Sequence, residues 1–184
     1  YAGFQAPFDG FIPSTDIVIA RDEVIAFGMY RLLQHRFANA PQADDLMTGY
    51  DVHMETLGYD VNFNGTDYSS GDGRALGNYL ASQLIAFGLQ DGANEQNQYA
   101  NTSYTPINPP LIVDLPGNAT VLDLNRWQPL TLDVFIDQSG NAIPGETPDF
   151  LSPEWGQVTS WALTDADLTS YTRNGFEYKV YHDP

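Results

Sequence analysis

Residues 74–89 read RALGNYLASQLIAFGL, and this stretch decides the fold class. Leu76, Leu80, Leu84 and Phe87 recur at positions i, i+4, i+8 and i+11, which places them on one face of a helix. Gly88 stands near the end of the pattern, where glycine commonly ends a helix. The spacing therefore predicts an amphipathic helix over 74–89.

Two more helices are predicted upstream. The first covers 16–37, where Ser14, Thr15 and Asp16 offer N-caps. Its apolar stripe consists of Val18, Val24, Ile25, Met29, Leu32 and Leu33. Basic side chains at its end complement the helix dipole, namely Arg31, His35 and Arg36. The second helix covers 43–57 and is ended by Gly58.

The remaining sequence is rich in turn-forming residues. Residues 1–14 are punctuated by Gly and Pro and predict an extended arm, followed by a helical part over 15–91. Residues 92–184 predict loops with short helices that begin near Pro153 and Thr164. The apolar pieces 111–113 and 130–135 are either strands or buried extended segments, because their length does not decide. We therefore expect a mainly α, loop-rich fold with a few short extended segments, forming one domain or a portion of one over 1–184.

The charge is strongly acidic. The chain has 24 acidic and 7 basic residues, a net charge of −17, and a single lysine, Lys179. Nucleic acids and anionic membranes both attract clustered Lys and Arg, so these partners are not expected. No apolar run is long enough to span a bilayer. The acidity and the absence of cysteine fit a secreted or periplasmic protein. The absence of cysteine also excludes disulfides and zinc-thiolate sites from this chain.

One stretch resembles the front of a calcium-binding loop. Asp60, Asn62, Asn64 and Gly65 follow the alternating pattern of oxygen ligands and a turn glycine. The twelfth position should carry a bidentate Glu, but it is Gly71. We therefore predict a loop whose side chains cap its own turns, rather than a metal site.

Other candidate groups lack the spacing of a reactive site. The histidines His35, His53 and His182 are far apart and share no metal-ligand pattern. The carboxylate pairs Asp44-Asp45 and Asp165/Asp167 are typical of helix starts. No catalytic, cofactor-binding or metal-binding residue is assigned in this chain.

Two polar segments have structural interpretations. Residues 91–95, Asp-Gly-Ala-Asn-Glu, directly follow the third predicted helix and indicate a C-terminal turn. Arg126 lies between two apolar stretches, where a guanidinium is expected to be paired with a carboxylate. Its candidate partners are Asp123, Asp133 and Asp137.

A series of short segments carries a family resemblance when taken in order. These segments are Arg31–Phe37, Leu57–Asp60, Leu76–Asn78, Asp91–Glu95, Tyr104–Pro110, Asn125–Leu130, Ile136–Gln138, Phe150–Leu163 and Tyr181–Pro184. The series resembles the large vanadium-dependent haloperoxidase-like proteins of the type-2 phosphatidic acid phosphatase superfamily. The resemblance covers most of residues 24–184.

The resemblance implies a chain that precedes the catalytic region of an enzyme. The family signature consists of a Lys, Arg-Pro, Pro-Ser-Gly-His, and Ser-Arg followed by His. This chain has no Arg-Pro and no Pro-Ser-Gly-His. The resemblance thus implies a non-catalytic N-terminal scaffold that packs on a catalytic helical bundle. Its partner would be the C-terminal catalytic portion of the same protein. That portion would either oxidise halide with peroxide on vanadate, or hydrolyse phosphate esters at the same site.

Two other functions stay open from the sequence. An acidic secreted module with Tyr- and Trp-rich loops would bind a carbohydrate or a protein partner. A domain stabilised by calcium on the 60–72 loop is the third interpretation. A homo-oligomer is compatible with each of them.

Overall fold

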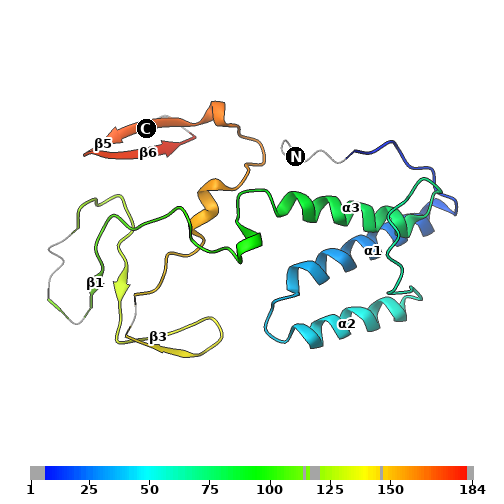
Figure 1. Cartoon of the computed structure of the whole chain (residues 1–184), viewed down its shortest axis with the longest axis horizontal. Helices are drawn as coiled ribbons and strands as arrows, with labels where there is room; N and C mark the ends of the chain where they lie inside the picture. The colour runs from blue at the N-terminus through cyan, green and yellow to red at the C-terminus, as the bar shows by residue number, and fades with distance from the viewer. Residues whose placement is uncertain (1–6, 114, 117–120, 146, 182–184) are drawn as a thin grey trace. The chain divides into compact units, whose positions relative to one another are not determined.

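The computed structural model describes residues 7–113, 115–116, 121–145 and 147–181. The chain divides into two compact units, Tyr1–Asp91 (unit 1) and Gly92–Pro184 (unit 2). It is mainly α with minor β (Figure 1). The α-helices of the described residues lie in unit 1 and the short strands lie in unit 2.

Unit 1 contains α1 (Ile17–Phe37), α2 (Ala43–Thr56) and α3 (Gly73–Gly88), which confirms the three predicted helices. Asp16 caps α1, because its carboxylate accepts a hydrogen bond from the N–H of Val18. Asp72 caps α3 in the same way by accepting from the N–H groups of Arg74 and Ala75. Each cap satisfies backbone donors that the first helical turn leaves unpaired.

Helix α1 packs most extensively against α3 (Figure 1). A Cβ added to Gly77 would lie 2.6 Å from the carbonyl oxygen of Val24 and 2.9 Å from the backbone nitrogen of Gly28. A Cβ at Gly73 would lie 2.5 Å from the carbonyl oxygen of Ala20. The two backbones can approach this closely only because glycine stands at both positions of α3.

The core of unit 1 centres on Phe27, Tyr30 and Met54. The rings of Tyr59 and Phe63 lie edge-on to Phe27, at centroid distances of 5.5 and 5.8 Å. The buried residues of α1 are Ala20, Phe27 and Tyr30. By contrast, Val18, Ile25 and Met29 of the predicted apolar stripe are exposed. These three positions of the stripe therefore face solvent, whereas Val24, Leu32 and Leu33 are half-buried.

The described part of the predicted N-terminal arm lies on unit 1. The Phe8 ring stacks on Tyr68 at 5.8 Å, and Tyr79 donates a hydrogen bond to the carbonyl of Pro7. The backbone N–H of Ser14 donates to the carbonyl of Gly71 at 2.9 Å. These contacts tie the arm to α3 and to the loop before it.

Unit 2 is built from short elements joined by long loops (Figure 1). The described residues of unit 2 form three two-stranded sheets. Strand β1 (Leu111–Ile112) pairs in parallel with β2 (Leu130–Thr131). Strands β3 (Val134–Ile136) and β4 (Ala142–Pro144) pair antiparallel, as do β5 (Thr169–Arg173) and β6 (Phe176–Val180). Its 3-10 helices are η1 (Glu95–Asn97), η2 (Pro153–Gln157) and η3 (Asp165–Asp167).

The structure decides whether the apolar pieces of unit 2 are strands or buried extended segments. The apolar pieces at 111–113 and 130–135 supply strands β1, β2 and the start of β3. Helix η2 begins at Pro153, and Thr164 and Asp167 form a reciprocal capping box around η3, as predicted. The β5–β6 hairpin was not predicted.

Candidate functional site

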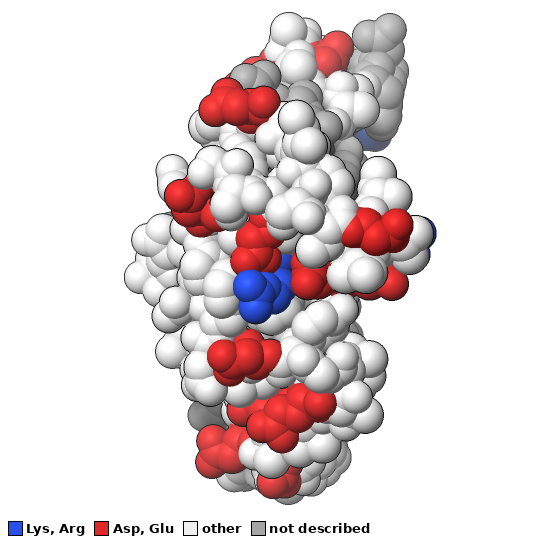
Figure 2. Space-filling model, turned by 90° about the vertical axis from the view of Figure 1, so that its right-hand side faces the viewer, with Lys and Arg blue, Asp and Glu red and all other residues white. Residues whose placement is uncertain are grey.

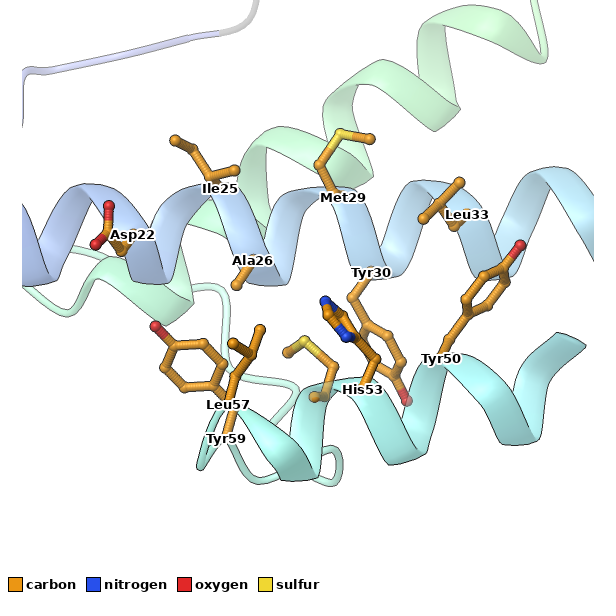
Figure 3. Close-up of a pocket in the computed structure, with 11 residues that line it drawn as sticks. Asp22, Ile25, Ala26, Met29, Tyr30, Leu33, Tyr50, His53, Leu57 and Tyr59 are labelled. Carbon is orange, nitrogen blue, oxygen red and sulfur yellow. The ribbon is translucent and has the colours of Figure 1, made fainter.

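A groove of about 470 Å³ runs between α1 and α2 (Figure 3). Its lining is mostly apolar and aromatic and consists of Asp22, Ile25, Ala26, Met29, Tyr30, Leu33, Tyr50, His53, Met54, Leu57 and Tyr59. Figure 3 shows the side chains of α2 and its following loop directed toward α1. A concave apolar surface with a few polar groups is the usual form of a binding site.

The groove leaves large apolar side chains in contact with solvent. Ile25 is 55% exposed and Met29 is 49% exposed, and Leu57 is exposed on the α2 side. Ile25 and Met29 remain open because α1 turns its Phe27 face toward the core of the unit. Contiguous exposed apolar surface of this kind marks an interaction site more often than isolated exposed residues do.

Two tyrosines set the polar character of the groove floor. Tyr30 donates a hydrogen bond to Asp51 at 2.5 Å. Burial and then the Asp51 carboxylate raise the pKa of Tyr30 to about 12. Burial also raises the pKa of Tyr59, with further contributions from Glu23 and Asp22. Both hydroxyls therefore stay protonated near neutral pH, and carboxylates lie close to each of them.

A clamp of two side chains holds the loop that positions Tyr59. Asn78 is buried in α3 and donates to the carbonyls of Phe63 and Gly65 at 3.2 and 3.1 Å. Arg31 donates to the carbonyl of Phe63 at 2.7 Å and to the Asn78 side-chain oxygen at 3.1 Å. Arg31 also donates to the carbonyl of Val61 at 3.3 Å. The loop carbonyls thus face a guanidinium and an amide.

The residues of the calcium-like motif, Asp60 to Gly71, make hydrogen bonds within the protein. The Asp60 carboxylate accepts from the N–H and the side-chain amide of Asn62, so it caps the turn that follows it. Gly71, at the twelfth position, accepts hydrogen bonds from Ser14. The contacts are those of a loop that satisfies its own turns. Among the described residues, no group of three or more His, Cys, Asp or Glu side chains is arranged to hold a metal ion.

The other sequence candidates are dispersed. His35 lies in the last turn of α1, and His53 lines the groove from α2. His182 lies outside the described residues. Asp44 and Asp45 occupy the first turn of α2, and the N–H of Asp91 donates to the carbonyl of Gly88 in a turn after α3. Among the candidates that lie in the described residues, the structure brings together no cluster that could hold a metal ion.

Arg126 has the partner that the sequence predicted. Its Nε lies 3.9 Å from the Asp123 carboxylate, an ion pair too long for a hydrogen bond. The guanidinium also covers the Tyr178 ring at 4.2 Å and donates to the carbonyl of Glu177. Tyr178 donates to Asp123, and this bond together with the Asn125 N–H lowers the pKa of that carboxyl. Asp137 instead accepts from Ser139 and Asn141.

Unit 2 is organised around two buried polar side chains that sequence reasoning missed. Asn108 is 1% exposed; its oxygen accepts from the N–H groups of Leu122 and Asp123, and its amide donates to carbonyls of the same loop. Glu154 accepts four hydrogen bonds from the backbone and hydroxyls of Thr102 and Ser103. No local pattern signals either network, because their partners lie far along the chain.

A second hollow of about 500 Å³ lies in unit 2. Tyr104 and Phe150 lie 4.5 Å apart between ring centroids, and Trp127 meets Phe150 edge-on at 5.1 Å. Asn101 and Asp149 stand in the same lining. Elsewhere in the unit, Trp155 is 77% exposed and Trp161 is 80% exposed. Unit 2 therefore also presents aromatic surface to its surroundings.

Comparison with known proteins leaves the family open. No family model matches the chain, and no solved structure matches it. No helix in the described part of the chain is both long and apolar enough to cross a membrane.

Proposed function

We propose that this chain is the non-catalytic scaffold of an enzyme that resembles the vanadium haloperoxidases and acid phosphatases. It packs on a C-terminal catalytic portion of the same protein. The observation that carries this proposal is the exposure of large apolar side chains on both units. Ile25, Met29 and Leu57 are exposed on unit 1, and Trp155 and Trp161 are exposed on unit 2. Surfaces of this composition are stabilised when a partner covers them.

The basic residues support a non-catalytic role. An oxyanion such as vanadate or phosphate needs several fixed cations around its oxygens. Arg31 points its donors at loop carbonyls, Arg74 is paired with Asp72 at 2.7 Å, and Arg126 covers Tyr178. Each of these guanidinium groups is engaged with carbonyls, a carboxylate or a ring of its own unit. The oxyanion site therefore belongs to the catalytic portion in this proposal.

The test is reconstitution. The chain is mixed with the separately expressed portion that carries Pro-Ser-Gly-His, and co-elution is followed by size-exclusion chromatography. We expect a complex, with vanadate-dependent halide oxidation or phosphatase turnover in the complex and none in the chain alone. Turnover by the isolated chain, or two components that never co-elute, would contradict the proposal.

A second candidate function is ligand binding by unit 2. The hollow at Tyr104, Trp127 and Phe150 favours it, because aromatic rings beside amide and carboxylate groups are common in sites for polar organic ligands. A carbohydrate-array screen followed by tryptophan fluorescence titration tests this function. Saturable quenching that is lost in Trp127→Ala and kept in Trp155→Ala would support the module, and an unchanged spectrum with every sugar would remove it.

A further inference from the structure

We propose that the α1–α2 groove binds an amphipathic helix whose apolar face is flanked by Lys and Arg. This inference rests on the proposed docking role, and it names the chemistry of the partner at this surface. The groove runs along α1 from Asp22 to Leu33 (Figure 3). That distance is three helical turns, or about 16 Å. It exceeds the roughly 10 Å that positions i to i+7 of a helix span, so a helix that inserts apolar side chains at i, i+3 or i+4, and i+7 can lie along it.

The side chains in the groove suit this kind of occupant. Met29 is unbranched, polarisable and 49% exposed, so it adapts to the side chains of an inserted helix. The rings of Tyr50 on α2 and Tyr59 in the loop after α2 supply flat apolar area from the side opposite α1. Ile25 and Leu57 stand exposed at the groove and would be covered by such a helix.

The charges near the groove select a basic partner. Helix α2 carries Asp44, Asp45, Asp51 and Glu55 and has no Lys or Arg. At the other side, Asp22 and Glu23 are close enough to Tyr59 to raise its pKa after burial. The Arg31 guanidinium lies 4.9 Å from the Tyr30 ring centroid, and it donates its hydrogen bonds to Asn78 and the loop carbonyls. Arg21 is paired with Asp22 at 2.8 Å, but both side chains are exposed and such pairs are weak.

The same charges disfavour two other occupants. A second copy of this chain would bring another −17 charge against the acidic helix α2. An anionic lipid surface would be repelled for the same reason. Acidic side chains are spread over the face drawn in Figure 2, with little basic surface among them. A Lys- and Arg-flanked helix combines apolar contact with charge complementarity.

The experiment uses a synthetic helical peptide of Leu and Lys, about 14 residues long, which gives roughly four turns. Its binding to the whole chain is measured by isothermal titration calorimetry. Two peptide controls are a version with Glu in place of Lys and a scrambled peptide of equal composition. The variants are Ile25→Ser and Met29→Ser. The matched control is Ile19→Ser, because Ile19 is 53% exposed on the same helix but does not line the groove.

We expect saturable binding that weakens about tenfold or more in Ile25→Ser and Met29→Ser. Ile19→Ser should bind like the natural chain, and circular dichroism should show all three variants folded. The Glu peptide and the scrambled peptide should bind at least about tenfold more weakly. Equal effects of Ile25→Ser and Ile19→Ser, or equal binding of all peptides, would overturn the proposal. Self-association of the chain that Ile25→Ser abolishes would overturn it in favour of a second copy.

Failure of the two proposals can be told apart. Peptide binding at the groove, without co-elution of the catalytic portion, removes the proposed function and leaves the groove assignment standing. Co-elution that Ile25→Ser and Met29→Ser do not weaken, with no peptide binding, keeps the scaffold role and removes the groove from it.

Discussion

Several single side chains stabilise unit 1 through hydrogen bonds to residues far away in the sequence. Tyr30 reaches Asp51 on another helix, and Arg31 and Asn78 share the carbonyl of Phe63. Each of these groups is removed from full solvation, so the loss of one partner leaves the other unsatisfied. The groove floor is consequently sensitive to small chemical changes at Tyr30.

Tyr30→Phe should lower the free energy of unfolding at neutral pH by about 1–3 kcal/mol, because it removes the donor to the Asp51 carboxylate. The folded pKa of Tyr30 is raised to about 12, above an unfolded value of about 10. Its stabilisation is therefore complete below about pH 10 and is lost as the pH rises toward 12. Urea unfolding across this range should show a smaller alkaline loss in Tyr30→Phe.

Asp51→Asn is the companion variant for this prediction. It keeps an acceptor for the Tyr30 hydroxyl but removes the negative charge. Most stability at neutral pH should remain, with a weaker alkaline loss than in the natural chain. An alkaline transition identical in all three proteins would contradict the role of this hydrogen bond.

Glu154→Gln should lower the melting temperature at neutral pH, because one carboxylate oxygen is replaced by an amide that faces the donors of Thr102 and Ser103. The Thr102 N–H and then the Ser103 and Thr102 hydroxyls lower the pKa of Glu154. Its stabilisation is present above the unfolded pKa of about 4 and is lost as the pH falls below it. Thermal melts at several pH values should thus converge for variant and natural chain in acid. Glu177→Gln, at an exposed position of β6, is the control and should melt normally.

At the scale of elements, the α1–α3 contact requires glycine at position 77 of α3 but not at position 28 of α1. Gly77 leaves no room for a Cβ beside the backbone of Val24 and Gly28. Gly28 itself would place a Cβ 3.5 Å from the carbonyl oxygen of Gly77, which is an ordinary contact. The two positions therefore form a natural matched pair within one interface.

Gly77→Ala should destabilise unit 1 by about 1–3 kcal/mol, because the helices must move apart or strain. Gly28→Ala should be neutral or stabilising by up to about 1 kcal/mol, since alanine favours the helix and meets no close atom. Urea denaturation of both variants measures the difference. Equal effects of the two substitutions would show that the close approach does not limit stability.

The loop from Asp60 to Gly71 should not respond to calcium. Its carbonyls at Val61, Phe63 and Gly65 accept from Arg31 or Asn78, and Asp60 caps its own turn. We expect equal melting temperatures with calcium and with a chelator, measured by scanning calorimetry. A calcium-dependent rise in melting temperature would restore the metal-binding interpretation of this loop.

At the scale of the whole molecule, the excess of acidic residues opposes compaction. A net charge of −17 produces self-repulsion that salt screens over a distance of about 10 Å at 0.1 M. Raising sodium chloride from low concentration to about 0.5 M should therefore raise the melting temperature. A fall in melting temperature with salt would mean that ion pairs such as Arg74–Asp72 outweigh the repulsion.

The helices could be predicted from the sequence because their signals are local. The spacing of Leu76, Leu80 and Leu84 and the cap at Asp16 act within a few residues of each other. The β5–β6 hairpin had a local signal as well. Asn174-Gly175 forms its turn with φ of 51° and 84°, and Asn-Gly is a strong hairpin signal.

The amino-acid sequence alone determined the three helices, the acidic surface and the absence of cysteine chemistry. Only the tertiary structure decided which face of α1 is buried, because Ile25 and Phe27 are equally apolar and the close glycine contact with α3 selects between them. It also brought Glu154 to Thr102 and Asn108 to Leu122. A buried polar group must find its partner in space, and that partner can lie anywhere along the chain.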